Sequence, residues 1–281
     1  MNPLKKENLS MNPRIAFIGG GNMASAIIGG LIRQGTLAQD IDAVEPFEAA
    51  RAALRQTHGV EAQAQAGEFL SQASLVVWAV KPQTFRAAAS AVQAFTRYAL
   101  HLSVAAGIPS SSIASWVGSE RVVRAMPNTP ALIGRGMTAL FARAAVTDDD
   151  RARVSQVIAT TGELMWLDAE EQLDAVTALS GSGPAYVFYF LEAMRAAGAD
   201  MGLSAEQAYQ LAVATFIGAG ELARASSEPP EVLRQRVTSP GGTTHAAITT
   251  MEQHQIKAHF MQALQAARHR AAELGQEFGA A

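Results

Sequence analysis

The chain has 281 residues, of which 49% are apolar and 17% are charged, so it is long enough for one large globular domain or two ordinary ones. A net charge of −3, from 22 Lys and Arg against 25 Asp and Glu, argues against nucleic acid or an anionic membrane as the main partner. Cysteine is absent, which excludes disulfides, thiolate nucleophiles and Cys-bound metals and fits the reducing cytoplasm. The first ten residues are polar and predict a loose tail, and no segment predicts a membrane span.

From Arg14 onward, short apolar segments alternate with amphipathic ones. The apolar segments predict strands at 15–18, 41–44, 75–80, 100–104 and 122–126, with two more at 137–141 and 163–167. The amphipathic segments predict helices at 22–34, 46–57, 82–96, 110–117 and about 148–161. This alternation predicts a parallel sheet that is covered by helices on both faces.

After Asp168 the pattern predicts helices alone, at roughly 170–180, 184–200, 204–226, 230–237, 246–251 and 255–276. The segment from Tyr186 to Met194 is apolar on nearly every side of a helix, so we expect a subunit interface to cover it. The predicted fold is therefore an α/β Rossmann-like domain at 11–168, preceded by a flexible tail at 1–10 and followed by an all-α dimerisation domain at 169–281.

A glycine-rich turn lies between the first predicted strand and the first predicted helix. Its sequence, Gly19-Gly20-Gly21-Asn22-Met23-Ala24, fits the G-x-G-x-x-G/A pattern of dinucleotide-binding turns. Gly19 permits a tight turn, Gly21 lets the backbone approach a pyrophosphate, and Ala24 permits close packing of the helix. The free N–H groups at the start of the helix favour phosphates. A glycine-rich loop without a ligand is the other interpretation, and the flanking strand and helix favour the dinucleotide.

The residues expected to determine whether the cofactor is NAD or NADP do not decide between the two. Glu45 ends the second predicted strand, where an acidic residue binds the ribose 2′-hydroxyl of NAD. It would repel a 2′-phosphate unless Arg51 or Arg55 covers that group, and it equally fits a role in capping the helix that begins at Pro46.

Three more segments leave predicted strands at the same edge of the sheet: Val80–Pro82, Ala105–Gly107 and Met126–Pro130. Lys81 can approach cofactor phosphates there, or it can be a solvated loop lysine. Two prolines fix the backbone around Asn128 and Thr129, so these are positioned polar groups on the expected nicotinamide side.

Two polar, glycine-rich islands interrupt the helical region, one at Ser180–Pro184 and one at Thr238–Thr244. Consecutive small residues before a helix expose backbone N–H groups, which suits a carboxylate or a phosphate. Ordinary helix capping by Ser and Thr is the alternative, but Gly241-Gly242 followed by two threonines exceeds what a cap requires.

Six segments together resemble pyrroline-5-carboxylate reductase: Phe17–Met23, Ala79–Pro82, Met126–Pro130, Asp174–Thr177, Ser180–Tyr186 and Val237–Thr244. They run in order and cover nearly all of the chain except the tail, and Ser239–Ile248 is the most specific part. The resemblance implies the reduction of 1-pyrroline-5-carboxylate to L-proline by hydride transfer from NADPH, with NADH as the alternative. It also implies a cytoplasmic homodimer or higher oligomer that interlocks through the helical domain.

The resemblance implies the site residues as well. Backbone N–H groups of Gly242, Thr243 and Thr244 would bind the pyrroline carboxylate, and the Thr244 hydroxyl would approach the ring nitrogen. Glu170, from across the dimer, and Ser182 would complete the substrate site. The cofactor would contact Ile18, Gly19, Gly20, Gly21, Asn22, Met23, Ala24, Glu45, Ala79, Val80, Lys81, Pro82 and Asn128. Two departures bear on cofactor preference: Ala66 stands where some relatives carry Asn, and Glu45 where NADPH users often carry an uncharged polar residue.

A protonated imine is already a strong hydride acceptor, so this reaction needs neither a metal nor a catalytic cysteine. The histidines show no ligand-like cluster, and His245, beside Thr244, is a candidate for proton transfer. A β-hydroxyacid-dehydrogenase-like reductase would need a catalytic lysine, yet no Lys lies between Lys81 and Lys257. A non-catalytic NADPH-binding sensor need not keep the Gly242–Thr244 island, and a purely structural protein would explain neither glycine-rich site.

Overall fold

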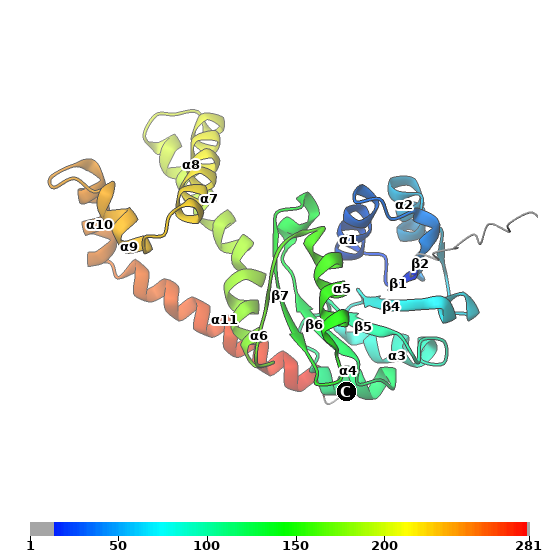
Figure 1. Cartoon of the computed structure of the whole chain (residues 1–281). Coiled ribbons are helices and arrows are strands. Elements are labelled where there is room, and N and C mark those ends of the chain that lie inside the picture. The colour runs from blue at the N-terminus through cyan, green and yellow to red at the C-terminus, as the bar shows by residue number, and fades with distance from the viewer. Residues whose placement is uncertain (1–13, 280–281) are drawn as a thin grey trace, which may run out of the picture. The chain divides into compact units, whose positions relative to one another are not determined.

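The structure, a computed structural model, describes residues 14–279 (Figure 1), so the predicted tail at 1–10 lies outside the described residues. The described residues form two compact units, one comprising Ser182–Ala267 and the other residues 14–181 together with 268–279. The first unit thus extends beyond the boundary expected near Asp168, and it also contains the end of the last helix.

The first unit is built on an eight-stranded sheet with the order β3-β2-β1-β4-β5-β6-β7-β8. All neighbouring strands are parallel except β6 and β7. The strands are β1 (Arg14–Ile18), β2 (Ile41–Val44), β3 (Ala62–Gln63), β4 (Ala73–Trp78), β5 (Leu100–Ser103), β6 (Val122–Met126), β7 (Gly136–Ala142) and β8 (Gly162–Trp166). The parallel pairs arise because a crossover connection returns the chain to the same edge of the sheet before the next strand begins.

The helices of the first unit largely agree with the sequence expectation. They are α1 (Asn22–Arg33), α2 (Glu48–His58), α3 (Pro82–Val92), α4 (Ser110–Val117), α5 (Asp148–Ala159) and α6 (Gln172–Val176). A π-helical turn, Thr177–Gly181, follows α6 where the sequence predicted ordinary helix. The fourth strand also begins and ends two residues earlier than expected at 75–80, because Ala79 and Val80 already belong to the loop that carries Lys81.

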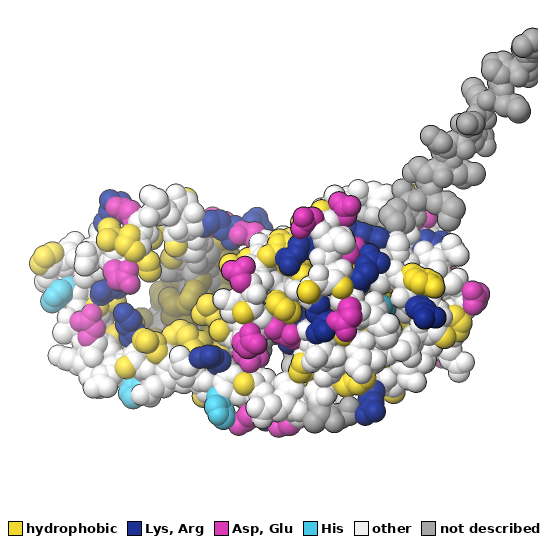
Figure 2. Space-filling model, turned by 60° about the horizontal axis from the view of Figure 1, so that its bottom comes forward, with side chains coloured by type: hydrophobic (Ala, Val, Ile, Leu, Met, Phe, Trp, Pro, Cys, Tyr) yellow, Lys and Arg dark blue, Asp and Glu magenta, His cyan; other side chains and the backbone are white. Residues whose placement is uncertain are grey.

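The second unit consists of helices, as expected. They are α7 (Gly183–Asp200), α8 (Ala205–Ala225), α9 (Pro230–Arg236), α10 (Thr243–Gln253) and the first part of α11 (Ile256–Gly279). The ring of Phe260 on α11 meets Tyr186 and Phe190 of α7 edge-on, with centroids 5.7 and 5.8 Å apart. Figure 2 shows hydrophobic side chains gathered around a hollow in the left half of the view. Among the described residues, no helix is long and apolar enough to cross a bilayer.

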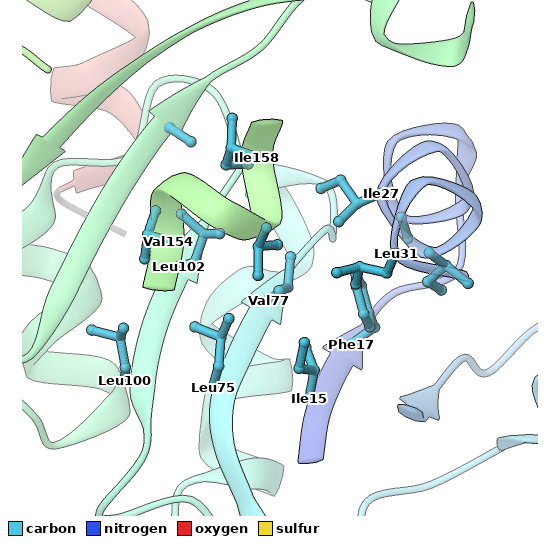
Figure 3. Packing of buried hydrophobic residues seen from close by; sticks show 14 of the residues in the cluster. Ile15, Phe17, Ile27, Leu31, Leu75, Val77, Leu100, Leu102, Val154 and Ile158 are labelled. Atoms are coloured by element: carbon cyan, nitrogen blue, oxygen red, sulfur yellow. The ribbon is translucent and has the colours of Figure 1, made fainter. Parts of the chain in front are cut away.

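Two hydrophobic clusters cover the two faces of the sheet. Successive residues of a strand point to opposite faces, so Ile15 and Phe17 of β1 enter one cluster while Ala16 and Ile18 enter the other. The first cluster packs the sheet against α1 and α5, as Figure 3 shows for Phe17, Ile27 and Ile158. The second packs it against α3 and α4. The predicted double coverage of the sheet is therefore confirmed.

One buried histidine gives the fold a defined acid sensitivity. His101 of β5 is fully buried, its Nδ1 accepts a 3.1 Å hydrogen bond from Trp78 Nε1, and burial lowers its pKa to about 4. The unfolded chain binds a proton near pH 6.5 and the folded chain does not, so stability falls as the pH drops from 6.5 toward 4.

We expect the wild type to lose about 2 kcal/mol of unfolding free energy at pH 5, relative to pH 7, that the His101→Gln variant does not lose. Urea unfolding of both proteins at several pH values measures the difference, and every other titrating group cancels between them. Parallel pH profiles of the two proteins would contradict this assignment.

Candidate active site

The order of the strands defines the edge of the sheet at which a ligand is expected. After β1 the chain runs to β2 and β3 on one side, and it then returns to β4 on the other side of β1. This reversal creates a crevice at the carboxyl ends of β1 and β4, which is the usual ligand site of an open parallel sheet. The glycine-rich turn follows β1 and the segment Ala79–Pro82 follows β4, so the topology places both at this crevice.

Backbone bonds from both neighbouring strands hold the start of the glycine turn. Gly19 N–H donates to Val44 O at 2.8 Å, and Ala79 N–H donates to Ile18 O at 2.8 Å. Gly19 has a φ of +97°, and a Cβ at this position would lie 2.5 Å from Ala79 O. Only glycine fits both the conformation and the space, which confirms the tight turn predicted at Gly19.

The space beside Gly21 and the start of α1 is open. No atom lies within 4 Å of the position that a Cβ of Gly21 would occupy, and both Gly21 and Asn22 are exposed. Gly21 is the N-cap of α1, no side chain caps the helix, and its first turn contains no acidic residue. Met23 and Ala24 pack inward against the first cluster, so the helix lies close to the sheet. Uncapped N–H groups beside open space fit the pyrophosphate of a dinucleotide.

Glu45 joins this turn to the loop after β2. Its side chain is 6% exposed, its Oε2 accepts a 2.7 Å bond from Gly20 N–H, and its Oε1 accepts a 2.9 Å bond from Phe47 N–H. The sequence had left a choice between a cofactor residue and a cap for the next helix. The bond to Phe47, which is the N-cap residue of α2, supports the capping role, while the bond to Gly20 places the same carboxylate against the glycine turn.

Lys81 and Asn128 differ in how their side chains are used. Lys81 is exposed and is the N-cap residue of α3, whose first turn contains Pro82 and no acidic residue. Asn128 follows β6, and its Oδ1 accepts from Met137 N–H at 2.9 Å while its Nδ2 donates to Ser180 O at 3.2 Å. Asn128 therefore fixes the loop after β6 against the π-helical turn, a structural use that the sequence did not suggest.

The π-helical turn brings the first polar island against β6. A Cβ on Gly181 would lie 2.5 Å from Met126 Cε, so this glycine permits the close approach. Ser182 follows as the N-cap residue of α7, and its hydroxyl makes no capping bond. Turns of this kind are frequent at functional sites.

Glu170 anchors a polar cluster within the first unit. Its Oε1 accepts from Ser110 N–H and from Arg124 Nη1, each at 2.6 Å, and its Oε2 accepts from the Ser110 hydroxyl at 2.5 Å. Burial alone would raise the pKa of this carboxyl, but the bonds from Ser110 and Arg124 outweigh it, and the pKa is lowered. The structure thus gives Glu170 partners in α4 and β6, which the sequence did not predict.

The second polar island has the geometry of an anion site. Gly241 has a φ of +72°, Gly242 N–H donates to Ser239 O at 3.0 Å, and α10 begins at Thr243. No side chain caps α10, whose first turn contains no acidic residue. The first N–H groups of α10, from Thr243 onward, therefore lack a capping side chain, which is the arrangement that suits an anion.

Histidine and carboxylate side chains do not form a metal site in the part of the chain that the structure describes, since no group of three could hold an ion there. His245 is exposed on the first turn of α10, beside Thr244.

Family models match both units. A model described as pyrroline-5-carboxylate reductase dimerisation matches residues 170–274, and a model of coenzyme F420-dependent NADP oxidoreductases matches residues 14–107. The second match covers the glycine turn and the loop after β4, and it fits NADPH as the cofactor, with NADH as the alternative.

Relatives match over nearly the whole chain. A pyrroline-5-carboxylate reductase of Pseudomonas aeruginosa is 45% identical, over 95% of this chain and 98% of the relative. One of Vibrio alginolyticus is 38% identical, over 94% and 98%. The solved pyrroline-5-carboxylate reductase of Coxiella burnetii is 36% identical with a TM-score of 0.87, over 93% and 98%. A Plasmodium falciparum pyrroline carboxylate reductase, solved with NADP bound, is 27% identical with a TM-score of 0.84, over 94% and 98%. This chain therefore belongs to the pyrroline-5-carboxylate reductases, nicotinamide-dependent oxidoreductases that reduce 1-pyrroline-5-carboxylate to L-proline.

Proposed function

We propose that this chain reduces 1-pyrroline-5-carboxylate with two anion-binding helix starts, one in each unit. The start of α1 binds the pyrophosphate of the nicotinamide cofactor, and the start of α10 binds the substrate carboxylate. The observation that carries this proposal is that both helices begin after glycine-rich turns with neither a capping side chain nor an acidic first turn.

The cofactor residues that we propose share the edge of the sheet around β1 and β4. Ile18 ends β1 and is buried, so it supports the turn, and Gly20 lies close to Leu54 and Glu45. The proposed set is Ile18, Gly19, Gly20, Gly21, Asn22, Met23, Ala24, Glu45, Ala79, Val80, Lys81, Pro82 and Asn128. We assign Asn128 to positioning, because its amide group is bonded to the protein.

In the second unit we propose that the N–H groups of Thr243 and Thr244 hold the carboxylate. Gly242, whose N–H already donates to Ser239 O, contributes by shaping the turn before α10. The Thr244 hydroxyl then lies within the first turn of α10 and hydrogen-bonds the ring nitrogen of the substrate. We keep Ser182 and Glu170 as proposed contributors to the substrate site. Since Glu170 already accepts three hydrogen bonds, we propose that it acts by holding Ser110 and Arg124 in place.

The bound nicotinamide supplies a hydride, and the electrophile is the carbon of the protonated imine. As the carbon–hydrogen bond forms, the C=N π electrons move to the nitrogen and neutralise its positive charge, which gives proline and the oxidised cofactor. The protein's part is to position the two reactants and to exclude water, effects that can be large. Thr244 can also orient the nitrogen, and so can select the face of the imine that is attacked.

The test is to incubate the purified protein with 1-pyrroline-5-carboxylate and either NADPH or NADH while following the absorbance of the reduced nicotinamide. We expect substrate-dependent oxidation of the cofactor and formation of proline. If neither cofactor is oxidised, the proposed activity of this chain is wrong.

We further propose that the chain is a cytoplasmic homo-oligomer assembled through its helical unit. The cysteine-free composition fits that compartment, and the match to a dimerisation family supports that interface. Large apolar side chains are exposed on α7, α8, α10 and α11: Val187, Phe188, Tyr189, Met194, Tyr209, Leu211, Ile217, Leu222, Met251, Ile256 and Met261. An open cavity of about 710 Å³ lies among Phe190, Ile248 and Phe260 within this unit. Apolar surface on this scale needs a cover, and a second copy of the chain supplies one.

Phe188→Asp is therefore expected to lower the molar mass measured by light scattering after size exclusion. Phe188 is 58% exposed in a single chain, and a carboxylate buried in the interface would be strongly destabilising. Tyr98→Asp is the matched control, because Tyr98 is 85% exposed on the first unit. An unchanged mass for Phe188→Asp would contradict an interface at α7.

A further inference from the structure

We propose that the Glu45 carboxylate selects between the two nicotinamide cofactors by disfavouring the 2′-phosphate of NADPH relative to the free 2′-hydroxyl of NADH. This inference rests on the cofactor site proposed above. It concerns how strongly the site distinguishes two cofactors that both fit the glycine turn.

The geometry places Glu45 beside the glycine turn, at the end of β2. It directly follows β2, the strand beside β1, and its Oε2 lies 2.7 Å from the N of Gly20, between the tight turn at Gly19 and the open position at Gly21. In an open parallel sheet with this turn, the group at the end of the second strand meets the ribose hydroxyls of the dinucleotide. Because the second bond, from Phe47 N–H, holds the other oxygen, the carboxylate cannot swing away without losing both contacts.

The chemistry of the carboxylate decides which ribose it favours. An ionised carboxylate only accepts hydrogen bonds and has about four lone-pair positions. Two are used by Gly20 and Phe47, so acceptor capacity remains for a ribose hydroxyl, which can donate. A 2′-phosphate is an anion with acceptor oxygens, and beside the carboxylate it meets repulsion without gaining a hydrogen bond.

Arg51 and Arg55 of α2 are the basic side chains that could offset this repulsion, and Arg55 is exposed in the last turn of that helix. The Nη1 of Arg51 donates to the carbonyl oxygens of Glu45 at 2.9 Å and of Pro46 at 2.6 Å. Two backbone carbonyls thus hold this nitrogen, and Arg51 would have to meet a phosphate with its other N–H groups or give up these bonds. Because these bonds tie Arg51 to the loop after β2, we infer that the Glu45 carboxylate sets the ratio between the two cofactors.

The experiment measures dissociation constants for NADPH and NADH by calorimetry, and kcat/KM with each cofactor. We expect Glu45→Gln to shift both ratios toward NADPH by about tenfold, since the charge is lost and the shape is nearly kept. Glu45→Asp retains the charge and should remain near the wild type. Glu48→Gln is the matched control, because Glu48 is exposed three positions further along, in the first turn of α2. A ratio that stays constant in Glu45→Gln, or that shifts equally in Glu48→Gln, would overturn the proposal.

A measurement on the wild type keeps the proposal testable if Glu45 variants fold poorly. Added salt screens a repulsion, so it should strengthen NADPH binding relative to NADH binding. The effect of salt on the pyrophosphate contacts is common to both cofactors, so it cancels in the ratio of the two dissociation constants. A relative weakening of NADPH would mean net attraction of the 2′-phosphate and would refute the role of Glu45. Failure of the wild type to bind either cofactor would instead refute the cofactor site itself.

Discussion

Replacing Thr244 with alanine is expected to lower kcat/KM for 1-pyrroline-5-carboxylate by about 100-fold. In our proposal this hydroxyl bonds the ring nitrogen, whose charge changes during hydride transfer. A hydrogen bond to a charged group contributes roughly 1.5–3 kcal/mol, and its loss in the transition state lowers the rate accordingly. Thr244 lies in the first turn of α10 and is only partly exposed, so removing its hydroxyl should leave the unfolding free energy nearly unchanged.

Two variants isolate the hydroxyl of Thr244. Thr243→Ala removes the neighbouring, exposed hydroxyl but keeps the backbone N–H that we assign to the carboxylate, so its kinetics should resemble the wild type. Thr244→Ser restores a hydroxyl and should recover most of the activity. Steady-state kinetics at saturating NADPH provide the comparison. Wild-type kinetics in Thr244→Ala would remove this residue from the active site.

The fold was predictable where the sequence signal is local. Buried strands such as β1 and β4 are short, mostly apolar runs, and the pattern of α1 and α5 is long enough to identify each helix. β3 escaped prediction because it has only two residues, Ala62 and Gln63, and exists through its pairing with β2. The π-helical turn at Thr177–Gly181 was equally hidden, since Gly181 lies close to Met126 of β6, a neighbour 55 positions away in the sequence.

The candidate site also has a part with a local sequence signal and a part without one. The glycine turn and the start of α10 could be proposed as anion sites from the sequence, because such a site is made of consecutive residues. The partners of Glu170 could not, because Ser110 and Arg124 lie 60 and 46 positions away in the sequence and are brought close only by the sheet. The two contacts of Glu45 explain why its pattern was ambiguous: one carboxylate caps a helix and faces the cofactor turn at once.

Alanine substitutions at two glycines of the glycine turn are expected to affect different properties, the stability of the fold for Gly19 and the binding of the cofactor for Gly21. Gly19→Ala should reduce the unfolding free energy by about 4 kcal/mol, because its φ is +97° and the new Cβ would meet the Ala79 carbonyl at 2.5 Å. Gly35→Ala is its control: Gly35 has a φ of +99° but nothing within 4 Å, so it should show the conformational cost alone, about 1–2 kcal/mol. Urea unfolding measures both.

Gly21→Ala should instead leave the fold intact and weaken the cofactor. Gly21 has an ordinary φ of −72° and nothing within 4 Å of a new Cβ, so we expect a loss of at most about 1 kcal/mol, the cost of alanine at an N-cap. The added methyl group would fill the space that we assign to the pyrophosphate, and the dissociation constants for NADPH and NADH should both rise by at least about tenfold. Calorimetry on the folded variant tests this directly. Unchanged binding would place the pyrophosphate elsewhere, whereas equal weakening of both cofactors separates this shared contact from the selective one at Glu45.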